Sequence, residues 1–278
     1  MTSTNKIINK YLNGKKVDKE NFDDFKIVIE TVGDSTKILD WFSYLHKIET
    51  VGWRPKLVTQ KVAKLLSRNE PIQFYALFCP SYKKGRDIHG FRTDGVGDTS
   101  KWGMSTLKAI NDKTTSLGFK CLTPLAVFFD VAVEQPEKSI PEISDLKKNI
   151  ENLKQIVPNN VEFRLLSKQF PFLMDIIGYK GIKIDPLPVP KVTLARIIER
   201  GRKFYELFAW TEKQIEDRSR TIASSEALVG SVLRDAFPTG LMVYTPTMLE
   251  RAQVYSGHRF ETDPLPIIFP KHEDITGL

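Results

Sequence analysis

Groups that can do chemistry follow directly behind one apolar stretch of the chain. The run Ile72–Phe78 leads into Cys79 and, two positions on, Ser81, and a basic segment containing Lys83 comes next. A thiol or hydroxyl at the end of a strand is a typical position for a nucleophile, and cationic neighbours favour the thiolate. We therefore expect Cys79 or Ser81 to act as a nucleophile. The alternative for Cys79 is a small buried core residue.

A glycine-containing turn follows the basic segment. Gly95 and Gly97 precede Asp98, where a helix is predicted over residues 99–117. Glycines let the backbone approach a ligand, and a helix N-terminus presents free N–H groups. The third glycine of the dinucleotide fingerprint and the Gly-Lys-Ser/Thr of the P-loop are missing. We expect Gly95, Gly97 and Lys83 to contact substrate, with Asp98 as an ordinary helix cap as the alternative.

Carboxylates in two places are candidates for acid–base work. Asp130 and Glu134 end the apolar run Phe-Phe-Asp-Val-Ala-Val-Glu, so they are expected at the same rim as Cys79, where Asp130 binds an amino group or a sugar hydroxyl. Glu226 lies among small and apolar neighbours, where a poorly solvated carboxylate can exchange protons. The alternatives are solvated strand caps for the first two and a surface charge for Glu226.

A late turn and a basic helix complete the candidate residues. Tyr255, His258 and Arg259 flank a glycine and are expected to close over an anionic or carbonyl group, unless they form an ordinary surface loop. A net charge of +7 and a pI of about 9.2 suit a polyanionic partner. Basic residues that recur at helical spacing predict a stripe that tracks phosphates, or else a solvated helix face. These residues are Arg196, Arg200, Arg202 and Lys203.

Composition limits the class of protein. The 278 residues are 41% hydrophobic and 27% charged, as in globular proteins. Two cysteines in separate apolar contexts and four scattered histidines predict neither a disulfide framework nor a metal site, and no cofactor is expected. The sequence shows no apolar run long enough to span a bilayer and no secretory signal, so we expect a cytoplasmic protein without a membrane partner.

Strand and helix patterns alternate along the chain, which predicts an α/β fold: a Rossmann-like, mostly parallel sheet flanked by helices. Strands are predicted at 72–78, 125–131, 161–166 and 241–244. Helices are predicted at 38–48, 56–67, 99–117, 144–156, 194–208 and 212–237. We expect a helical N-terminal extension over 1–70 and a catalytic domain over 71–278. A proline-rich extended linker at 181–190 leads into a helical segment, and residues 263–270 resemble that linker.

The order of these parts resembles the tRNA-dependent cyclodipeptide synthases, whose catalytic domain is similar to that of class I aminoacyl-tRNA synthetases. The similarity covers ALFCPS (76–81), VFFDVAVE (127–134) and FPTGLMVYTP with YSGHRF (237–246 and 255–260). It implies that Cys79 or Ser81 accepts an aminoacyl group and that the basic helix touches tRNA. The family's Gly-x-Ser-x-x-Asn pattern is absent.

The segment RNEPIQFYALFCPSYKK (68–84), followed by DGVGD (94–98), also resembles the isonitrile synthases of pyoverdine and dityrosine biosynthesis. That similarity implies that Lys83 or Lys84 binds a sugar phosphate or forms an imine with it.

Three functions therefore remain open. The first is an aminoacyltransferase that uses aminoacyl-tRNA, in which Asp130 or Glu134 holds the amino group and Tyr255 or Glu226 moves protons. The second is a small-molecule enzyme that acts on an amino acid and a sugar phosphate. The third is a nucleic-acid-binding module without catalysis. The sequence leaves the amino acid, the product and the oligomeric state undetermined.

Overall fold

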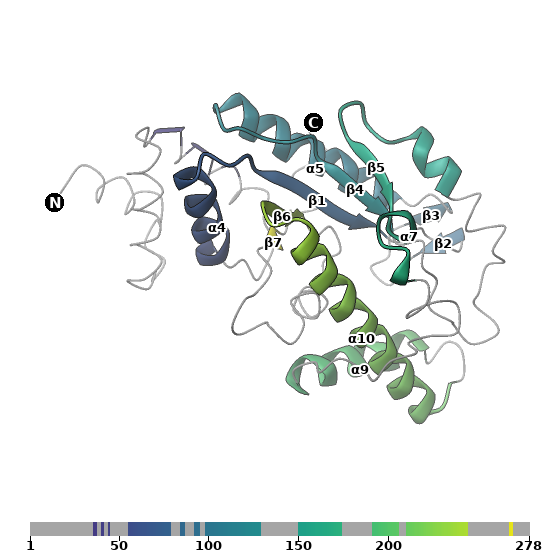
Figure 1. Ribbon diagram of the computed structural model, residues 1–278. Helices are drawn as coiled ribbons and strands as arrows, with labels where there is room; N and C mark the ends of the chain where they lie inside the picture. Colours follow the sequence, from purple (N-terminus) through teal and green to yellow (C-terminus); the bar gives the residue numbers. More distant parts are fainter. Residues whose placement is uncertain are drawn as a thin grey trace.

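Five parallel strands form the central sheet, which confirms the predicted α/β, Rossmann-like class (Figure 1). The computed structural model describes residues 36–37, 40–41, 44, 55–78, 84–86, 92–94, 98–128, 150–173, 191–205, 210–243 and 267–268. The strands are β1 (Gln73–Phe78), β4 (Leu125–Phe128), β5 (Glu162–Leu165), β6 (Gly240–Val243) and β7 (Ile267–Ile268). The first four coincide with the predicted strands to within a few residues.

The sheet has the order β5-β4-β1-β6-β7. From the central strand β1 the chain builds outward through β4 to β5, then returns to the other side of β1 for β6 and β7. All neighbouring strands pair in parallel. The direction of winding therefore reverses between β1 and β6. Such a reversal opens a crevice at the carboxyl ends of the two strands, and ligands of open α/β sheets bind there.

Alternate residues of each strand face two separate cores, because successive side chains of a strand point to opposite faces. Phe74, Ala76 and Phe78 of β1 belong to one hydrophobic cluster, and Tyr75 and Leu77 belong to the other. The helices α4 (Pro55–Ser67) and α5 (Asp98–Ser116) contribute to the first cluster. The helices α7 (Leu166–Gln169) and α10 (Glu212–Ala236) contribute to the second. Helices thus cover both faces of the sheet, as its uninterrupted apolar strands predict.

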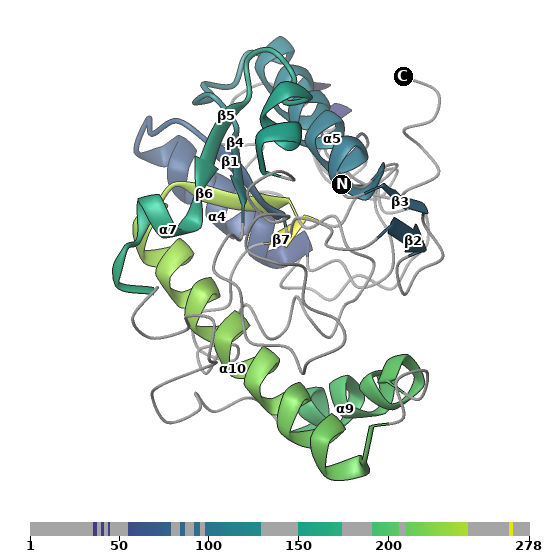
Figure 2. The same cartoon turned by 90° about the vertical axis from the view of Figure 1, so that its right-hand side faces the viewer.

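The long helix α10 runs in the opposite direction to the strands. Its N-terminus is closed by a capping box, in which Thr211 and Gln214 satisfy each other's backbone N–H groups. At its other end the Gly240 N–H donates to the Phe237 carbonyl at 2.8 Å, and Gly240 then pairs with Gln73 at the start of β1. A second helix, α9 (Lys191–Tyr205), packs against the N-terminal half of α10 (Figure 2).

Two features of the fold differ from the sequence prediction. The segment predicted as a basic loop after β1 contains a hairpin, in which β2 (Lys84–Arg86) pairs antiparallel with β3 (Arg92–Asp94). Within the proline-rich residues 263–270, Ile267–Ile268 pair with β6 as an edge strand. Proline is tolerated next to an edge strand because one side of the strand has no ladder to donate to. The division into 1–70 and 71–278 stays a prediction.

Trp41 connects the N-terminal part of the chain to the first core. Its side chain is fully buried, and its indole Nε1–H donates to Thr114 Oγ1 of α5 at 2.7 Å. The Thr114 hydroxyl donates in turn to the Ile110 carbonyl at 2.6 Å. The Trp41 ring also packs against Phe119, with 5.3 Å between ring centroids.

We expect Thr114→Val to lower the free energy of unfolding by about 2 kcal/mol, because the buried indole N–H loses its acceptor. The measurement is urea denaturation of the single variants Thr114→Val and Trp41→Phe and of the double variant. The double variant should be less destabilised than the sum of the singles, because removing both partners leaves no orphaned donor. Additive effects would show that the hydrogen bond contributes nothing specific.

Candidate functional site

The carboxyl ends of β1 and β4 lie level with each other at the crevice edge of the sheet. Phe78, the last residue of β1, is in register with Phe128, the last residue of β4. The sequence continues from these positions into Cys79 and into Phe129-Asp130. The strands therefore deliver both predicted polar segments to one edge.

Most of the predicted site residues lie outside the described residues, so their roles stay predictions. These are Cys79, Ser81, Lys83, Gly95, Gly97, Asp130, Glu134, Tyr255, His258 and Arg259. The described elements nevertheless fix where the chain enters and leaves these segments.

The basic hairpin lies next to the start of α5. Strand β3 contacts α5, and α5 begins at Asp98, directly after the segment that holds Gly95 and Gly97. Arg86 and Arg92 occupy directly opposite register positions in the hairpin. The hairpin therefore lies between the segment that follows β1 in the sequence and the start of α5.

Aromatic rings from β1, β4 and β5 pack together on the first face of the sheet. Phe128 stacks on Phe78 at 5.3 Å between centroids and on Phe163 of β5 at 4.7 Å. The ammonium of Lys154 lies 5.7 Å from the centre of the Phe163 ring. The stack joins the last residues of β1 and β4 to each other and to β5. The sequence shows the phenylalanines but not their contact across strands.

Glu226 belongs to α10, three positions before Val229, which packs in the second core. Its neighbours Ala223 and Ala227 are fully buried against α9. The Glu226 side chain is outside what the structure describes, so its acid–base role stays a prediction.

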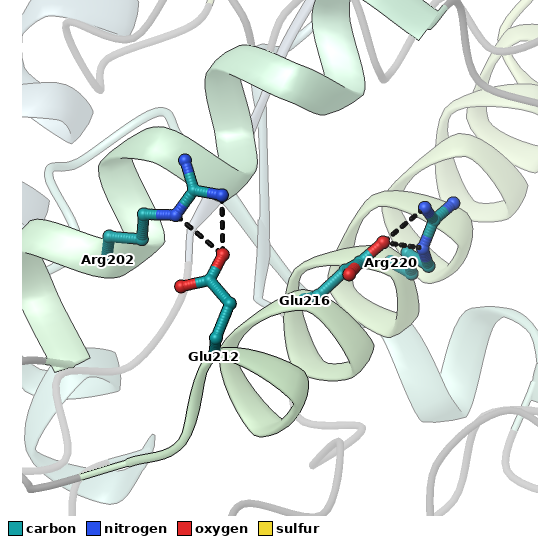
Figure 3. A network of polar contacts seen from close by, with 4 residues as sticks. All are labelled: Arg202, Glu212, Glu216 and Arg220. Carbon is teal, nitrogen blue, oxygen red and sulfur yellow. Dashed lines mark hydrogen bonds and ion pairs between the residues drawn. The ribbon is translucent and has the colours of Figure 1, made fainter.

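The basic stripe of α9 lies beside acidic residues of α10. Arg196 and Arg202 are exposed, and the backbone at Arg200 and Lys203 is helical. Arg202 donates from Nε and Nη2 to Glu212 Oε1, at 2.7 and 2.5 Å (Figure 3). One turn further along α10, Arg220 pairs with Glu216 at 2.5 Å. The charge on this surface is mixed, so the stripe offers less to a phosphate backbone than its sequence suggests.

The contact with Arg202 lowers the pKa of Glu212, first through the hydrogen bonds and then through charge attraction. A carboxylate whose pKa is lowered by folding stabilises the folded state above its unfolded pKa of about 4.3. That contribution is lost as pH falls through the lowered pKa. It is small, because both groups are exposed.

We expect carboxyl NMR to give Glu212 a titration midpoint below the ordinary glutamate range, and Arg202→Met to return it toward that range. Arg196→Met removes an exposed arginine from the same helix and should leave the midpoint unchanged. A Glu212 midpoint that is the same with and without Arg202 would contradict the pair.

Other groups in the described part of the chain add little chemistry. Cys121 is half-buried and unbridged, and burial raises the pKa of its thiol, the reverse of an activated nucleophile. Burial likewise raises the pKa of the Tyr75 phenol. Among the described residues, no group of three histidine, cysteine or acidic side chains is placed to hold a metal ion. No helix in this part of the protein is both long and apolar enough to cross a membrane.

No known protein family matches the chain, and no curated protein matches it. The chain is similar in shape to the crystal structure of the PvcA protein from Pseudomonas aeruginosa. That similarity has a TM-score of 0.48 and 12% sequence identity, and it covers 85% of this chain and 82% of the other. A likeness of this degree does not extend to activity.

Proposed function

We propose that the protein is an enzyme that binds a small, amino-acid-derived substrate in the crevice beyond the carboxyl ends of β1 and β6. One observation carries the proposal: the strand order β5-β4-β1-β6-β7 reverses its winding between these two strands. Sheets of this kind bind their ligands at that reversal. The segment that follows β1 is the one in which nucleophilic and cationic residues crowd together.

In the proposed site, Cys79 or Ser81 supplies the nucleophile and Asp130 or Glu134 holds the amino group of the substrate. Lys83, with the basic hairpin behind it, binds an anionic group of a second substrate, a sugar phosphate. Gly95 and Gly97 allow the backbone to approach that group at the start of α5. Glu226 and Tyr255 move protons, and His258 and Arg259 complete the anion contacts.

Of the predicted functions, the small-molecule enzyme has more support than the tRNA-dependent transferase. The tRNA hypothesis relies on the basic stripe of α9, and one of its four residues, Arg202, forms a two-pronged pair with Glu212. Attraction to the carboxylates of Glu199 and Glu216 also raises the pKa of the Arg202 guanidinium. The resemblance of residues 68–84 to isonitrile synthases supplies the reaction class: an amino acid reacting with a sugar phosphate.

The test is incubation of the purified chain with amino acids and a panel of pentose and hexose phosphates, followed by mass spectrometry of the products. The expected result is a product that contains the amino-acid nitrogen and carbon from the sugar. A parallel reaction receives aminoacyl-tRNA. Formation of a cyclic dipeptide there, with no reaction of the sugar phosphates, would replace the proposal with the transferase. No product in either reaction would remove both.

A further inference from the structure

Two neighbouring strands end on phenylalanines that face each other across the ladder. Phe78 ends β1 and Phe128 ends β4, and the two residues are in register. Both side chains are buried in the first hydrophobic cluster, and their rings stack at 5.3 Å between centroids with 28° between ring planes. In the sequence, Cys79 and Phe129 come directly after this pair. The stack therefore lies where the chain leaves the two strands for the segments that hold predicted site residues.

A third ring packs on the other side of Phe128. Phe163 of β5 is in register with Ala126, and its ring centroid lies 4.7 Å from that of Phe128, with 23° between ring planes. Ala126, two residues before Phe128, shares its face of the strand and is small enough to leave room for this ring. The Phe128 ring is thus enclosed between two others, and a change of its rotamer breaks an aromatic contact on each side.

The position of this stack along the strands gives it influence over the separation of the two chain exits. Among the described residues, Phe78 and Phe128 are the last pair of the ladder between β1 and β4. Ladder hydrogen bonds constrain the backbone from one side only at a terminal pair, so a side-chain contact there contributes more to the separation of the two backbones. That separation matters, because reacting groups misplaced by about 1 Å can lose roughly a hundredfold in rate.

We propose that Phe128 is a positioning residue for the proposed reaction. Through its stack on Phe78, it fixes the separation at which the chain leaves β1 and β4, and with it the separation of the proposed nucleophile from Asp130. Phe128 has no group that can react, so it acts through the strand ends that it holds together. The inference rests on the proposed function, and it assigns a role to a residue that the sequence pattern predicts only as part of a strand.

The first measurement is steady-state product formation by Phe128→Leu, which keeps most of the buried volume and loses the ring stacking. We expect kcat to fall about tenfold or more while KM changes less than about threefold. The reason is that a shift between reacting groups slows the chemical step more than it weakens substrate binding. Urea denaturation identifies a temperature at which every variant is fully folded, and the rates are compared there.

Phe119→Leu is the matched control. Phe119 belongs to the same cluster, is 6% exposed and packs on one other ring, that of Trp41. It lies near the amino end of β1, because Cys121, two residues on, bridges to Ile72. The control loses the same atoms and an aromatic contact at the opposite end of the strands. It should lower the urea midpoint and leave kcat as in wild type.

A second measurement reports the separation of the chain exits without any substrate. Phe129→Cys, in a Cys121→Ser background, puts a second thiol directly after β4, as Cys79 is directly after β1. If the register continues by one residue, the two Cα atoms lie about 4.8 Å apart, within the range that a disulfide spans. The oxidised fraction in graded glutathione buffers gives the effective concentration of the two thiols. Adding Phe128→Leu should lower it about tenfold, and adding Phe119→Leu should not change it.

Several results would overturn the inference. One is an equal effective concentration with and without Phe128→Leu, and another is the absence of the disulfide in the parent background. Equal losses of kcat in Phe128→Leu and Phe119→Leu would show a general loss of packing instead. Phe78→Leu breaks the same stack from β1 and replaces Phe128→Leu if that variant does not fold.

Failure of the inference and failure of the proposed function give different results. If product forms and Phe128→Leu keeps the wild-type kcat, the inference fails and the proposed function stands. If the disulfide responds as expected but wild type makes no product, the proposed function fails, and the effect of Phe128 on the separation of the strand ends stands by itself.

Discussion

Phe128→Ala is expected to lower the free energy of unfolding by about 4 kcal/mol, within the usual range for removing a buried phenylalanine. The side chain is fully buried and stacks on a ring on each side, Phe78 and Phe163. Removing it leaves a cavity between three strands and breaks two aromatic contacts, each worth about 1 kcal/mol beyond the buried area. The measurement is urea denaturation, in which the midpoint should fall while the m-value stays the same as in wild type.

Phe172→Ala is the matched control, because the same atoms are removed from a side chain that is 47% exposed. Phe172→Ala should lower the free energy of unfolding by less than about 1 kcal/mol. Phe128→Leu keeps most of the volume and loses the stacking, so it should lie between the two. Equal effects of Phe128→Ala and Phe172→Ala would show that the aromatic stack does not stabilise the contact between β1, β4 and β5.

Gly240→Ala is expected to lower the free energy of unfolding by about 3 kcal/mol, at the upper end of the range for inserting one methyl group into a packed core. A Cβ at Gly240 would lie 2.5 Å from Tyr75 Cε1, 2.7 Å from the Phe237 carbonyl oxygen and 2.9 Å from Phe237 Cβ. The tyrosine is fully buried and packs on the Phe237 ring, so it has no room to move. The carbonyl accepts the Gly240 N–H, so relaxation there would loosen the link from α10 to β6.

Thr239→Ala tests the neighbouring position, where a side chain is shortened instead of added. The Thr239 carbonyl accepts the Gln73 N–H, and that backbone contact survives the change. Thr239→Ala should lower the melting temperature far less than Gly240→Ala does. For a chain of this size, the loss expected for Gly240→Ala corresponds to a fall of roughly 6–12 °C. A Gly240→Ala protein as stable as wild type would mean that β6 does not approach Tyr75 as closely as described.

Local pattern was sufficient to predict the central elements of the fold. The apolar runs at 72–78 and 125–131 predicted strands buried on both faces, and the structure has β1 and β4 there. The predicted helix at 212–237 matches α10 almost residue for residue, because Thr211 and Gln214 form a capping signal that depends only on neighbouring residues. The hairpin after β1 was missed, because its strands have three residues each and no apolar alternation.

The sequence by itself determined the fold class, the positions of the main helices and strands, and the segments in which chemically capable residues crowd. These are consequences of the period of apolar residues and of turn and cap chemistry, which act over a few neighbours. Only the tertiary structure decided which strand ends meet. The reversal between β1 and β6 depends on pairing residues far apart in the chain, such as Tyr75 with Met242.

The tertiary structure also decided which charges are exposed and which are buried. Helical spacing predicted Arg196 and Arg202 as equivalent members of one basic stripe. Packing placed Arg202 on Glu212 at the surface, left Arg196 exposed, and buried Arg218 of the neighbouring helix α10. The environment of a charge is set by neighbours that are distant in sequence, so the function of such a residue follows from the fold and not from its spacing.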